Sequence, residues 1–373
     1  MVYYVLRFLV RLTLQMIFKK VEVTGIENIP KDRQVILVGN HPTAFMEPII
    51  LACWMQRPLN FMIRGDMWKP GFLAWLIDSI HGVPVYRKSE GFSSADANAK
   101  TFQRSADIIN AKELLIIFAE GSHEMVRRLR PFKKGTSRIV VQALEAKPEE
   151  DILVIPVAAT YNAHASLRRT VHVHVGEGLP LRQFNSENKP ETFLTMTRAM
   201  QNHLNQHLPD ITEEEELLFE QKLYRQAAFG KPFSRQWKDA EKELQRYSTE
   251  ERNKLASAAP AKDEELENRI LKSQMRWFHW AALIVFAIPA FIGKAVHLPV
   301  TMLSHFLSNK LAKKKIFFTS LFTAVSMVAT ILYYSILTII SLLVFGHLWY
   351  LLIGAICGLL SLRYYDLWRV ATA

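Results

Sequence analysis

Cysteine is scarce in this sequence, and metal-binding spacings are missing. The chain of 373 residues has two cysteines, Cys53 and Cys357, which lie far apart. Two such cysteines argue against a disulfide framework and a cysteine zinc site, and they fit a reducing compartment. No cluster of histidines, cysteines and carboxylates has metal-ligand spacing either. We therefore expect no metal site.

Charged side chains are absent from a long stretch near the C-terminal end. From Ile316 to Leu362 there is no Asp, Glu, Lys or Arg. The stretch is too long for one membrane span of about 20 residues, and long enough for two helices and a turn. Lys313–Lys315 precede it and Arg363 follows it, so the positive-inside rule predicts a hairpin with both ends on the cytoplasmic side. The alternative is a buried helix pair in a soluble protein.

A third apolar stretch, Trp277–Ile292, is shorter than a straight membrane span. If it extends to residue 303 it could form an additional span. It could instead be a re-entrant or interfacial segment, and the sequence leaves these alternatives open.

The N-terminal segment, residues 1–20, lacks the basic leader and the cleavage site of a signal peptide. Polar residues recur in it every four positions, at Arg7, Arg11, Gln15 and Lys19. One polar stripe on an otherwise apolar helix is typical of a helix lying in the membrane interface. The alternative is a helix that packs on the protein's own core.

Basic residues outnumber acidic ones, which gives a formal net charge of +11 and a pI near 9.5. This balance indicates an anionic partner, such as nucleic acid, an acidic membrane surface or a phosphorylated substrate. The most basic run, Arg127–Arg138, lacks the interleaved aromatic residues of single-strand-binding platforms. We therefore expect no nucleic-acid partner.

Residues 20–180 alternate strand-like and helical patterns, which predicts an α/β domain with a single central mixed sheet flanked by helices. The expected strands are Val35–Val38, Leu59–Ile63, Val83–Tyr86, Leu114–Phe118, Ile152–Ala158 and Val171–Val175, with helices over Ala95–Asn110 and Ser137–Ala146. The expected organisation is an interfacial helix (1–20), the α/β domain (21–210), a connector of charged helices (211–275), and a membrane region (276–373) with a hairpin at about 316–362 and a possible further span at about 277–303.

Four short blocks place reactive side chains next to expected strands. His41 follows the first strand within NHPTAFME, and Glu47 lies six positions later. The block GVPVYR ends in Arg87, and FAEGSH contains Glu120, Gly121 and Ser122 just before the basic run. The fourth block is VIPVAAT. Arginine suits phosphate because its guanidinium can bind in a bidentate manner, and glycine lets backbone N–H groups approach a ligand.

These four blocks, in this order, resemble those of the glycerolipid acyltransferase family, over roughly residues 20–180. The resemblance implies a membrane-bound O-acyltransferase that transfers a fatty acyl group to the hydroxyl of lysophosphatidic acid or glycerol-3-phosphate. The acyl thioester donor would be acyl-CoA or acyl carrier protein, with no further cofactor. The resemblance also implies the location. The protein would be integral to a membrane, most simply a bacterial inner membrane, with its active site on the cytoplasmic face.

The resemblance also implies roles for individual residues. His41 would be the general base and Glu47 its hydrogen-bond partner. Arg87 and the Glu120-Gly121 turn would bind the acceptor, with Ser122 as a neighbouring donor, and Lys133 and Lys134 would meet the acyl donor or membrane lipid. An offset of six separates side chains by about 240° on a regular helix, so His41 should lie in a loop and a helix should begin at Thr43 or Ala44.

The first block departs from the commonest family pattern. Five residues rather than four separate the histidine from the acid, Met46 stands at the usual acid position, and the acid is a glutamate. A subset of the family has this longer spacing. The alternative that this departure raises is a non-catalytic phospholipid-binding membrane protein on an acyltransferase scaffold.

Overall fold

The structure, a computed structural model, describes residues 2–68, 71–86, 94–164, 166–258 and 265–373. It divides into two compact units. The sheet unit comprises Met1–Phe8, Val23–Thr160 and His172–Asp210. The helical unit comprises Leu9–Glu22, Tyr161–Val171 and Ile211–Ala373. Each unit is described separately below.

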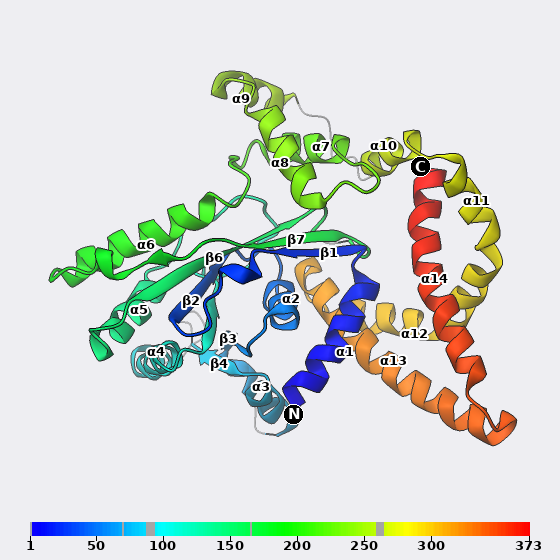
Figure 1. The fold of residues 1–373 in the computed structure, drawn as a ribbon, viewed down its shortest axis with the longest axis horizontal. Coiled ribbons are helices and arrows are strands. Elements are labelled where there is room, and N and C mark those ends of the chain that lie inside the picture. Colours follow the sequence, from blue (N-terminus) through cyan, green and yellow to red (C-terminus); the bar gives the residue numbers. More distant parts are fainter. Residues whose placement is uncertain (1, 69–70, 87–93, 165, 259–264) are drawn as a thin grey trace. The chain divides into compact units, whose positions relative to one another are not determined.

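The described residues form one eight-stranded mixed sheet (Figure 1). All six strands predicted from the sequence are present, because each apolar run supplies enough residues for a buried strand. Two strands were not predicted, the first and the last. The strands are β1 Lys20–Thr24, β2 Gln34–Gly39, β3 Leu59–Arg64, β4 Gly82–Val85, β5 Leu114–Ile117, β6 Ile152–Tyr161, β7 Thr170–Val175 and β8 Leu179–Pro180.

The order of strands is β1-β7-β6-β2-β5-β3-β4, with β8 antiparallel to β6. Strand β2 lies between β5 and β6 and is parallel to both. In this register Val38 is opposite Ile117 on one side and Pro156 on the other. Because parallel neighbours end at the same edge of the sheet, the loops that follow β2 and β5 emerge side by side.

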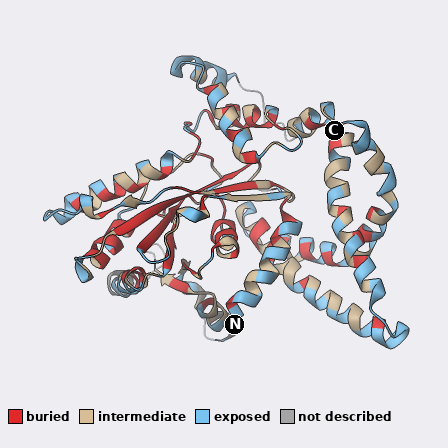
Figure 2. Cartoon of the chain, in the orientation of Figure 1, coloured by how far each residue is buried: buried red, intermediate tan, exposed pale blue. Residues whose placement is uncertain are grey.

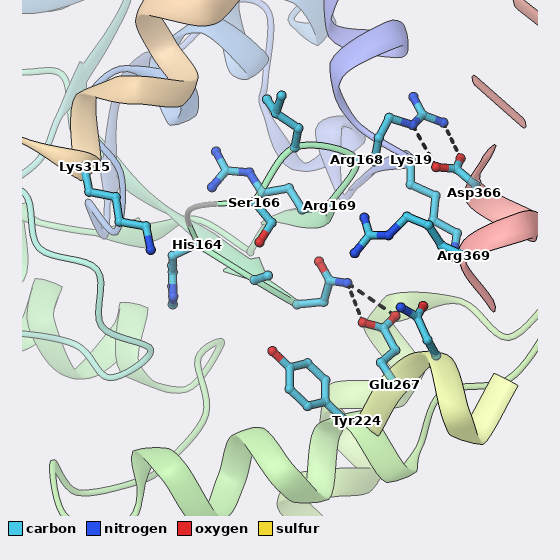
Figure 3. Close-up of a pocket in the computed structure, with 14 residues that line it drawn as sticks. Lys19, His164, Ser166, Arg168, Arg169, Tyr224, Glu267, Lys315, Asp366 and Arg369 are labelled. Atoms are coloured by element: carbon cyan, nitrogen blue, oxygen red, sulfur yellow. Dashed lines mark hydrogen bonds and ion pairs between the residues drawn. The ribbon is translucent and has the colours of Figure 1, made fainter. Parts of the chain in front are cut away.

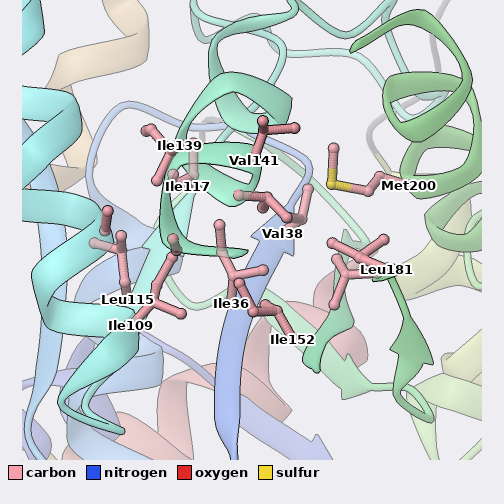
Figure 4. Close-up of a cluster of buried hydrophobic side chains, with 14 of the residues drawn as sticks. Ile36, Val38, Ile109, Leu115, Ile117, Ile139, Val141, Ile152, Leu181 and Met200 are labelled. Atoms are coloured by element: carbon pink, nitrogen blue, oxygen red, sulfur yellow. The ribbon is translucent and has the colours of Figure 1, made fainter. Parts of the chain in front are cut away.

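Strands β2 and β5 are buried along their whole length, as expected for parallel strands covered on both faces (Figure 2). The apolar cluster on one face joins Ile36 and Val38 of β2 to Leu115 of β5 and to helix residues Ile139 and Met200 (Figure 4). The helices of the sheet unit are α2 Met46–Trp54, α3 Phe72–Ser79, α4 Ser94–Asn110, α5 Gly135–Ala146 and α6 Lys189–Asn205.

The first helix, α1 (Val2–Ile17), contributes residues to both units. It exposes apolar side chains, among them Tyr4, Phe8 and Leu12. One residue of its polar stripe contacts the protein itself. Arg7 Nε donates a hydrogen bond to the carbonyl of Cys53 at 3.3 Å. The interfacial position of α1 stays a prediction.

The charged part of the helical unit forms helices with a small core of their own. Phe219, Phe233 and Trp237 lie at its centre and are each at most 3% exposed. The remaining faces of these helices carry the charged residues, as the amphipathic pattern predicted. The helices are α7 Glu216–Arg225, α8 Phe233–Leu244, α9 Thr249–Ser257 and α10 Leu266–Ser273.

The rest of the helical unit is apolar helix: α11 Trp277–Val285, α12 Ala287–Leu311, α13 Lys315–Phe345 and α14 Trp349–Thr372. By length and composition, α12, α13 and α14 could each cross a membrane. The two helices predicted for the charge-free stretch are α13 and α14. They are joined at Gly346, which takes the left-handed conformation (φ 70°) that suits glycine.

The segment from α11 to α12 begins and ends beside the same end of α14. Just before it, Leu271 of α10 packs against Val370. Just after it, Lys315 lines a pocket together with Arg369. The segment therefore returns to the end of α14 that it left, which the sequence alone could not decide.

Candidate active site

His41 and Glu47 meet at the carboxyl end of β2. The distance from His41 Nδ1 to Glu47 Oε2 is 3.0 Å, and the Glu47 side chain is only 2% exposed. His41 lies in the loop after β2, as the offset of six required. Glu47 lies in the first turn of α2, where a carboxylate is also favoured by the helix dipole.

The expected start of α2 was wrong. The helix begins at Met46, with Phe45 as its N-cap residue, and not at Thr43 or Ala44. The reason is the Thr43 hydroxyl, which donates to Glu47 Oε1 at 2.6 Å and accepts from the Met46 N–H at 3.3 Å. The Thr43 hydroxyl therefore provides a partner for one of the unpaired backbone N–H groups at the start of the helix. It also fixes the Glu47 carboxylate that faces His41.

The hydrogen bond fixes the tautomer of neutral His41. A carboxylate oxygen can only accept a hydrogen bond, so the Nδ1 atom of the imidazole must carry the proton. The other ring nitrogen, Nε2, then presents a lone pair. The arrangement can therefore take up a proton at Nε2 and stabilise the resulting imidazolium through Glu47.

Two residues that hold this loop were missed by the sequence analysis as positioning residues. Phe118 stacks on the His41 ring, with ring centroids 4.2 Å apart and an interplanar angle of 13°. The Asn40 side chain donates to the carbonyl of Ala159 at 3.0 Å and accepts from its N–H at 2.8 Å. Asn40 thus ties the loop to β6. An amide directly before the reactive histidine was the available signal.

Glu120 lies beside the His41 loop because β5 is the neighbour of β2. Its side chain is 2% exposed, and its Oε2 accepts from the His41 backbone N–H at 3.2 Å. Arg130 supplies the balancing charge, with Nη2 at 2.6 Å from Oε2. The backbone N–H of Arg130 also donates to Oε1 at 3.1 Å. Both carboxylate oxygens of Glu120 therefore hold the loops together.

Arg130 also binds Ser122, the predicted neighbouring donor. Arg130 Nη1 donates to Ser122 Oγ at 2.8 Å, and Nη2 donates to the Ser122 carbonyl. The sequence analysis had placed Arg130 only within a basic run. Its position in that run gave no sign that it pairs with Glu120.

Gly121 and Lys133 lie against each other. Gly121 has a φ of 74°, and an added Cβ would come within 2.9 Å of Lys133 Nζ. The Lys133 backbone N–H donates to the carbonyl of Ala119 at 2.8 Å, which holds the lysine over the glycine turn. Lys133 and Lys134 are both exposed. The glycine turn therefore lies beneath a cation.

Arg87, the remaining predicted binding residue, lies outside the described residues. Strand β4, which ends at Val85, is separated from β5 only by β3. Among the described residues, no group of three or more histidine, cysteine, aspartate or glutamate side chains is arranged to hold a metal ion.

Comparison with known proteins places this site in a family. The Acyltransferase family model matches residues 20–160. A 1-acyl-sn-glycerol-3-phosphate acyltransferase of Borreliella burgdorferi is 26% identical over 191 residues, which are 49% of this chain and 72% of that protein. Residues 20–160, which carry the site, thus match the Acyltransferase family model, in agreement with the resemblance found in the sequence. His41, Glu47 and Glu120 all lie within the acyltransferase domain that the family model matches.

Two further similarities are more limited. A 1-acyl-sn-glycerol-3-phosphate acyltransferase of Chlamydomonas reinhardtii is 25% identical over 127 residues, which are 34% of this chain and 36% of that protein. The crystal structure of the 1-acyl-sn-glycerophosphate (LPA) acyltransferase from Thermotoga maritima matches with 18% identity and a TM-score of 0.41. That match covers 55% of this chain and 79% of the other.

Proposed function

We propose that this acyltransferase is membrane-bound and transfers a fatty acyl group from acyl-CoA or acyl carrier protein to the hydroxyl of lysophosphatidic acid or glycerol-3-phosphate. The observation that carries the proposal is the contact between His41 Nδ1 and Glu47 at 3.0 Å. The relatives named above, which are 1-acyl-sn-glycerol-3-phosphate acyltransferases, support a lysophosphatidate acceptor.

In the proposed reaction, His41 Nε2 removes the proton of the acceptor hydroxyl as its oxygen attacks the thioester carbonyl. A C–O bond forms, and the carbonyl becomes a tetrahedral oxyanion. When the oxyanion collapses, the C–S bond breaks and the imidazolium returns its proton to the leaving thiolate. Glu47 stabilises the imidazolium between these two steps. The acceptor attacks directly, so no protein nucleophile and no cofactor are needed.

The acceptor phosphate would bind at the glycine turn. The Gly121 N–H is held by the Phe118 carbonyl at 3.0 Å, so the Lys133 ammonium, which lies over the turn, would supply the contact. Arg87 follows β4 in the sequence and would supply a bidentate contact. Lys134 would meet the acyl donor or membrane lipid. Because Glu120 is occupied by Arg130, we assign it to positioning of the two loops rather than to substrate contact.

The proposed location is the cytoplasmic face of a bacterial inner membrane. The three long apolar helices support a membrane association. The basic residues at both ends of the α13–α14 hairpin, Lys313–Lys315 and Arg363, support the cytoplasmic side by the positive-inside rule.

The test is a matrix of acceptors and donors, measured on the full chain reconstituted in lipid. Labelled acyl groups should move from at least one thioester to lysophosphatidate or to glycerol-3-phosphate. His41→Ala should abolish this turnover, and His347→Ala, a matched change in the hairpin turn, should leave it intact. Unchanged turnover in His41→Ala would refute the proposal.

The non-catalytic alternative rested on the longer spacing between histidine and acid. In the structure Glu47 reaches His41 despite that spacing, so the observation that favoured the alternative is gone. Lipid binding with no turnover across the whole matrix would restore it.

A further inference from the structure

The helical unit contains a pocket of about 220 Å³ that is rich in cations (Figure 3). We call it the cationic pocket and define it by Lys19, Arg168, Arg169, Lys315 and Arg369. None of these residues belongs to the four acyltransferase blocks. They come from the link between α1 and β1, from the turn between β6 and β7, and from the ends of α13 and α14.

The carboxylates of the cationic pocket are already engaged. Asp366 accepts from Arg168, with Nε at 3.0 Å from Oδ1. Glu267 accepts two hydrogen bonds from the Asn162 amide, at 3.0 and 3.3 Å. Both carboxylate interactions are drawn in Figure 3. The carboxylates therefore leave an excess of positive charge in the pocket.

That excess lies on three side chains. Among the residues that the structure describes, no carboxylate forms an ion pair with Lys19, Lys315 or Arg369. Lys315 is also the first residue of α13, a helix N-terminus at which the backbone dipole favours an anion. Three cations without a paired carboxylate that line one small pocket favour an anionic ligand.

Arg169 has a different, structural role. It is 1% exposed, and its guanidinium stacks on Tyr161 and Phe18 at 4.5 and 5.1 Å from the ring centroids. These aromatic contacts hold the wall of the cationic pocket in place. The ligand would therefore bind to the more accessible cations, Lys19, Lys315 and Arg369.

A second, larger cavity adjoins the first within the same unit. We call it the apolar cavity. Its volume is about 580 Å³, within the range of small-molecule binding sites. It shares Leu167, Arg168, Asp366 and Arg369 with the cationic pocket. Elsewhere it is lined mostly by apolar side chains, including Leu12, Met16, Leu298, Phe322, Ile331 and Leu359.

We propose that the cationic pocket and the apolar cavity form one binding site for an anionic phospholipid, with its phosphate among Lys19, Lys315 and Arg369 and its acyl chain in the cavity. A soluble phosphate would use the charges but would leave the adjoining apolar cavity empty. A neutral lipid would use the cavity but leave the cations uncompensated. An anionic phospholipid matches both, and α12–α14 are helices that could place the site in a bilayer.

This site is separate from the proposed chemistry. His41, Glu47 and Glu120 belong to the sheet unit, whereas every residue of the cationic pocket and of the apolar cavity belongs to the helical unit. The bound phospholipid would be a resident ligand of the membrane part of the enzyme rather than the acceptor in turnover.

The test measures lipid binding to the full chain in nanodiscs of neutral phosphatidylcholine. The probe is dipalmitoyl phosphatidylglycerol, an anionic phospholipid that is neither substrate nor product of the proposed reaction, counted as bound lipid by native mass spectrometry. The informative variant is Lys315→Gln/Arg369→Gln. Its matched control is Lys313→Gln/Lys314→Gln, which removes the same charge from exposed residues next to the pocket but not in it. Thermal unfolding checks that both variants fold.

Wild-type protein should bind the dipalmitoyl phosphatidylglycerol saturably. The affinity should fall at least about tenfold in Lys315→Gln/Arg369→Gln and stay within about twofold in the control. A dihexanoyl analogue should bind at least about tenfold more weakly than the long-chain lipid. Inorganic phosphate should not displace the long-chain lipid.

Three results would overturn the proposal. Equal weakening in both double variants would show general attraction of lipid to a basic surface. Efficient displacement by inorganic phosphate would show a site for a soluble anion. Non-saturable binding would show no site. None of these readouts depends on turnover, so the proposal and the acyltransferase activity can fail separately.

Discussion

Arg130 Nη2 lies 2.6 Å from Glu120 Oε2, and the same oxygen accepts a hydrogen bond from the backbone N–H of His41. The pair therefore joins the basic run after β5 to the loop that carries the imidazole. A buried ion pair of this kind adds little net stability compared with apolar side chains, but removal of one partner is costly. Its main effect is to fix the position of two loops.

Arg130→Gln should destabilise the sheet unit by about 3–5 kcal/mol, because it leaves the Glu120 carboxylate buried without its cation. Chemical denaturation measures the free energy of unfolding. Glu120→Gln/Arg130→Gln should cost less than Arg130→Gln alone, since no unpaired charge stays buried. Lys134→Gln, which removes an exposed charge of the same sign, should change stability by less than about 0.5 kcal/mol. A double variant less stable than Arg130→Gln would contradict this account.

Glu47→Gln should lower kcat about 10²- to 10⁴-fold, because a neutral amide can select the wrong imidazole tautomer and cannot stabilise the imidazolium. Glu47→Asp keeps the charge but shortens the arm, so it should lose part of the activity. Steady-state turnover with a saturating acceptor measures both effects. Glu145→Gln, an exposed glutamate of α5, is the matched control and should leave kcat unchanged. Full activity in Glu47→Gln would show that the contact between His41 and Glu47 has no role in catalysis.

Because of Glu22, we expect the unfolding free energy of the helical unit to fall at acid pH. Burial disfavours its charged form, but hydrogen bonds from Lys20 and from the N–H groups of Phe233 and Ser234 outweigh burial and lower the pKa of this carboxyl below 4.5. A lowered pKa contributes stability above pH 4.5, and that contribution is lost as the pH falls through the pKa of the folded state.

Glu22→Gln should therefore flatten the dependence of unfolding free energy on pH below about 4.5 and lower the stability at neutral pH. Denaturant titrations between pH 3 and pH 7 measure this. The control is Glu250→Gln, an exposed carboxylate of α9 in the same unit, whose curve should follow that of the wild type. Identical pH curves for Glu22→Gln and wild type would show that the contacts to Phe233 and Ser234 contribute nothing.

The α11–α12 segment should leave and re-enter on one side of the membrane, because both of its ends lie beside the same end of α14. In a chain whose native cysteines are replaced by alanine, Ser273→Cys and Lys313→Cys should react with an impermeant maleimide from the same side. His347→Cys, at the hairpin turn, should react from the opposite side. Detergent-solubilised protein gives the reference labelling. Reaction of Ser273→Cys and Lys313→Cys from opposite sides would establish a third full crossing.

The sequence predicted the elements that depend on local pattern. Buried strands such as β2 and β5 are continuous apolar runs, so they stand out. Strand β1, KVEVT, carries charge and lies at the sheet edge, and β8 has two residues, so neither produced a signal. The start of α2 was wrong because the Thr43 side chain, rather than backbone propensity, decides where the helix begins.

Interactions between distant residues were beyond the sequence. Arg130 is one of several similar cations in its run, and only the fold shows which of them reaches Glu120. The cationic pocket is a stronger case, because it combines Lys19, Arg168 and Arg369 from three separate segments. No spacing rule relates such positions, since their proximity depends on the packing of whole helices.

Phe118 covers one face of the His41 ring while Glu47 tethers one of its nitrogens. An imidazole held in both ways has little freedom to rotate, so its basic nitrogen points along one fixed line. If the acceptor proposed above is anchored by its phosphate, it can then offer only the oxygen that lies at the correct distance along that line. The regiochemistry of acylation becomes a property of the span between ring and anchor, and substitutions that lengthen or shorten this span should move the ester from one carbon to the next.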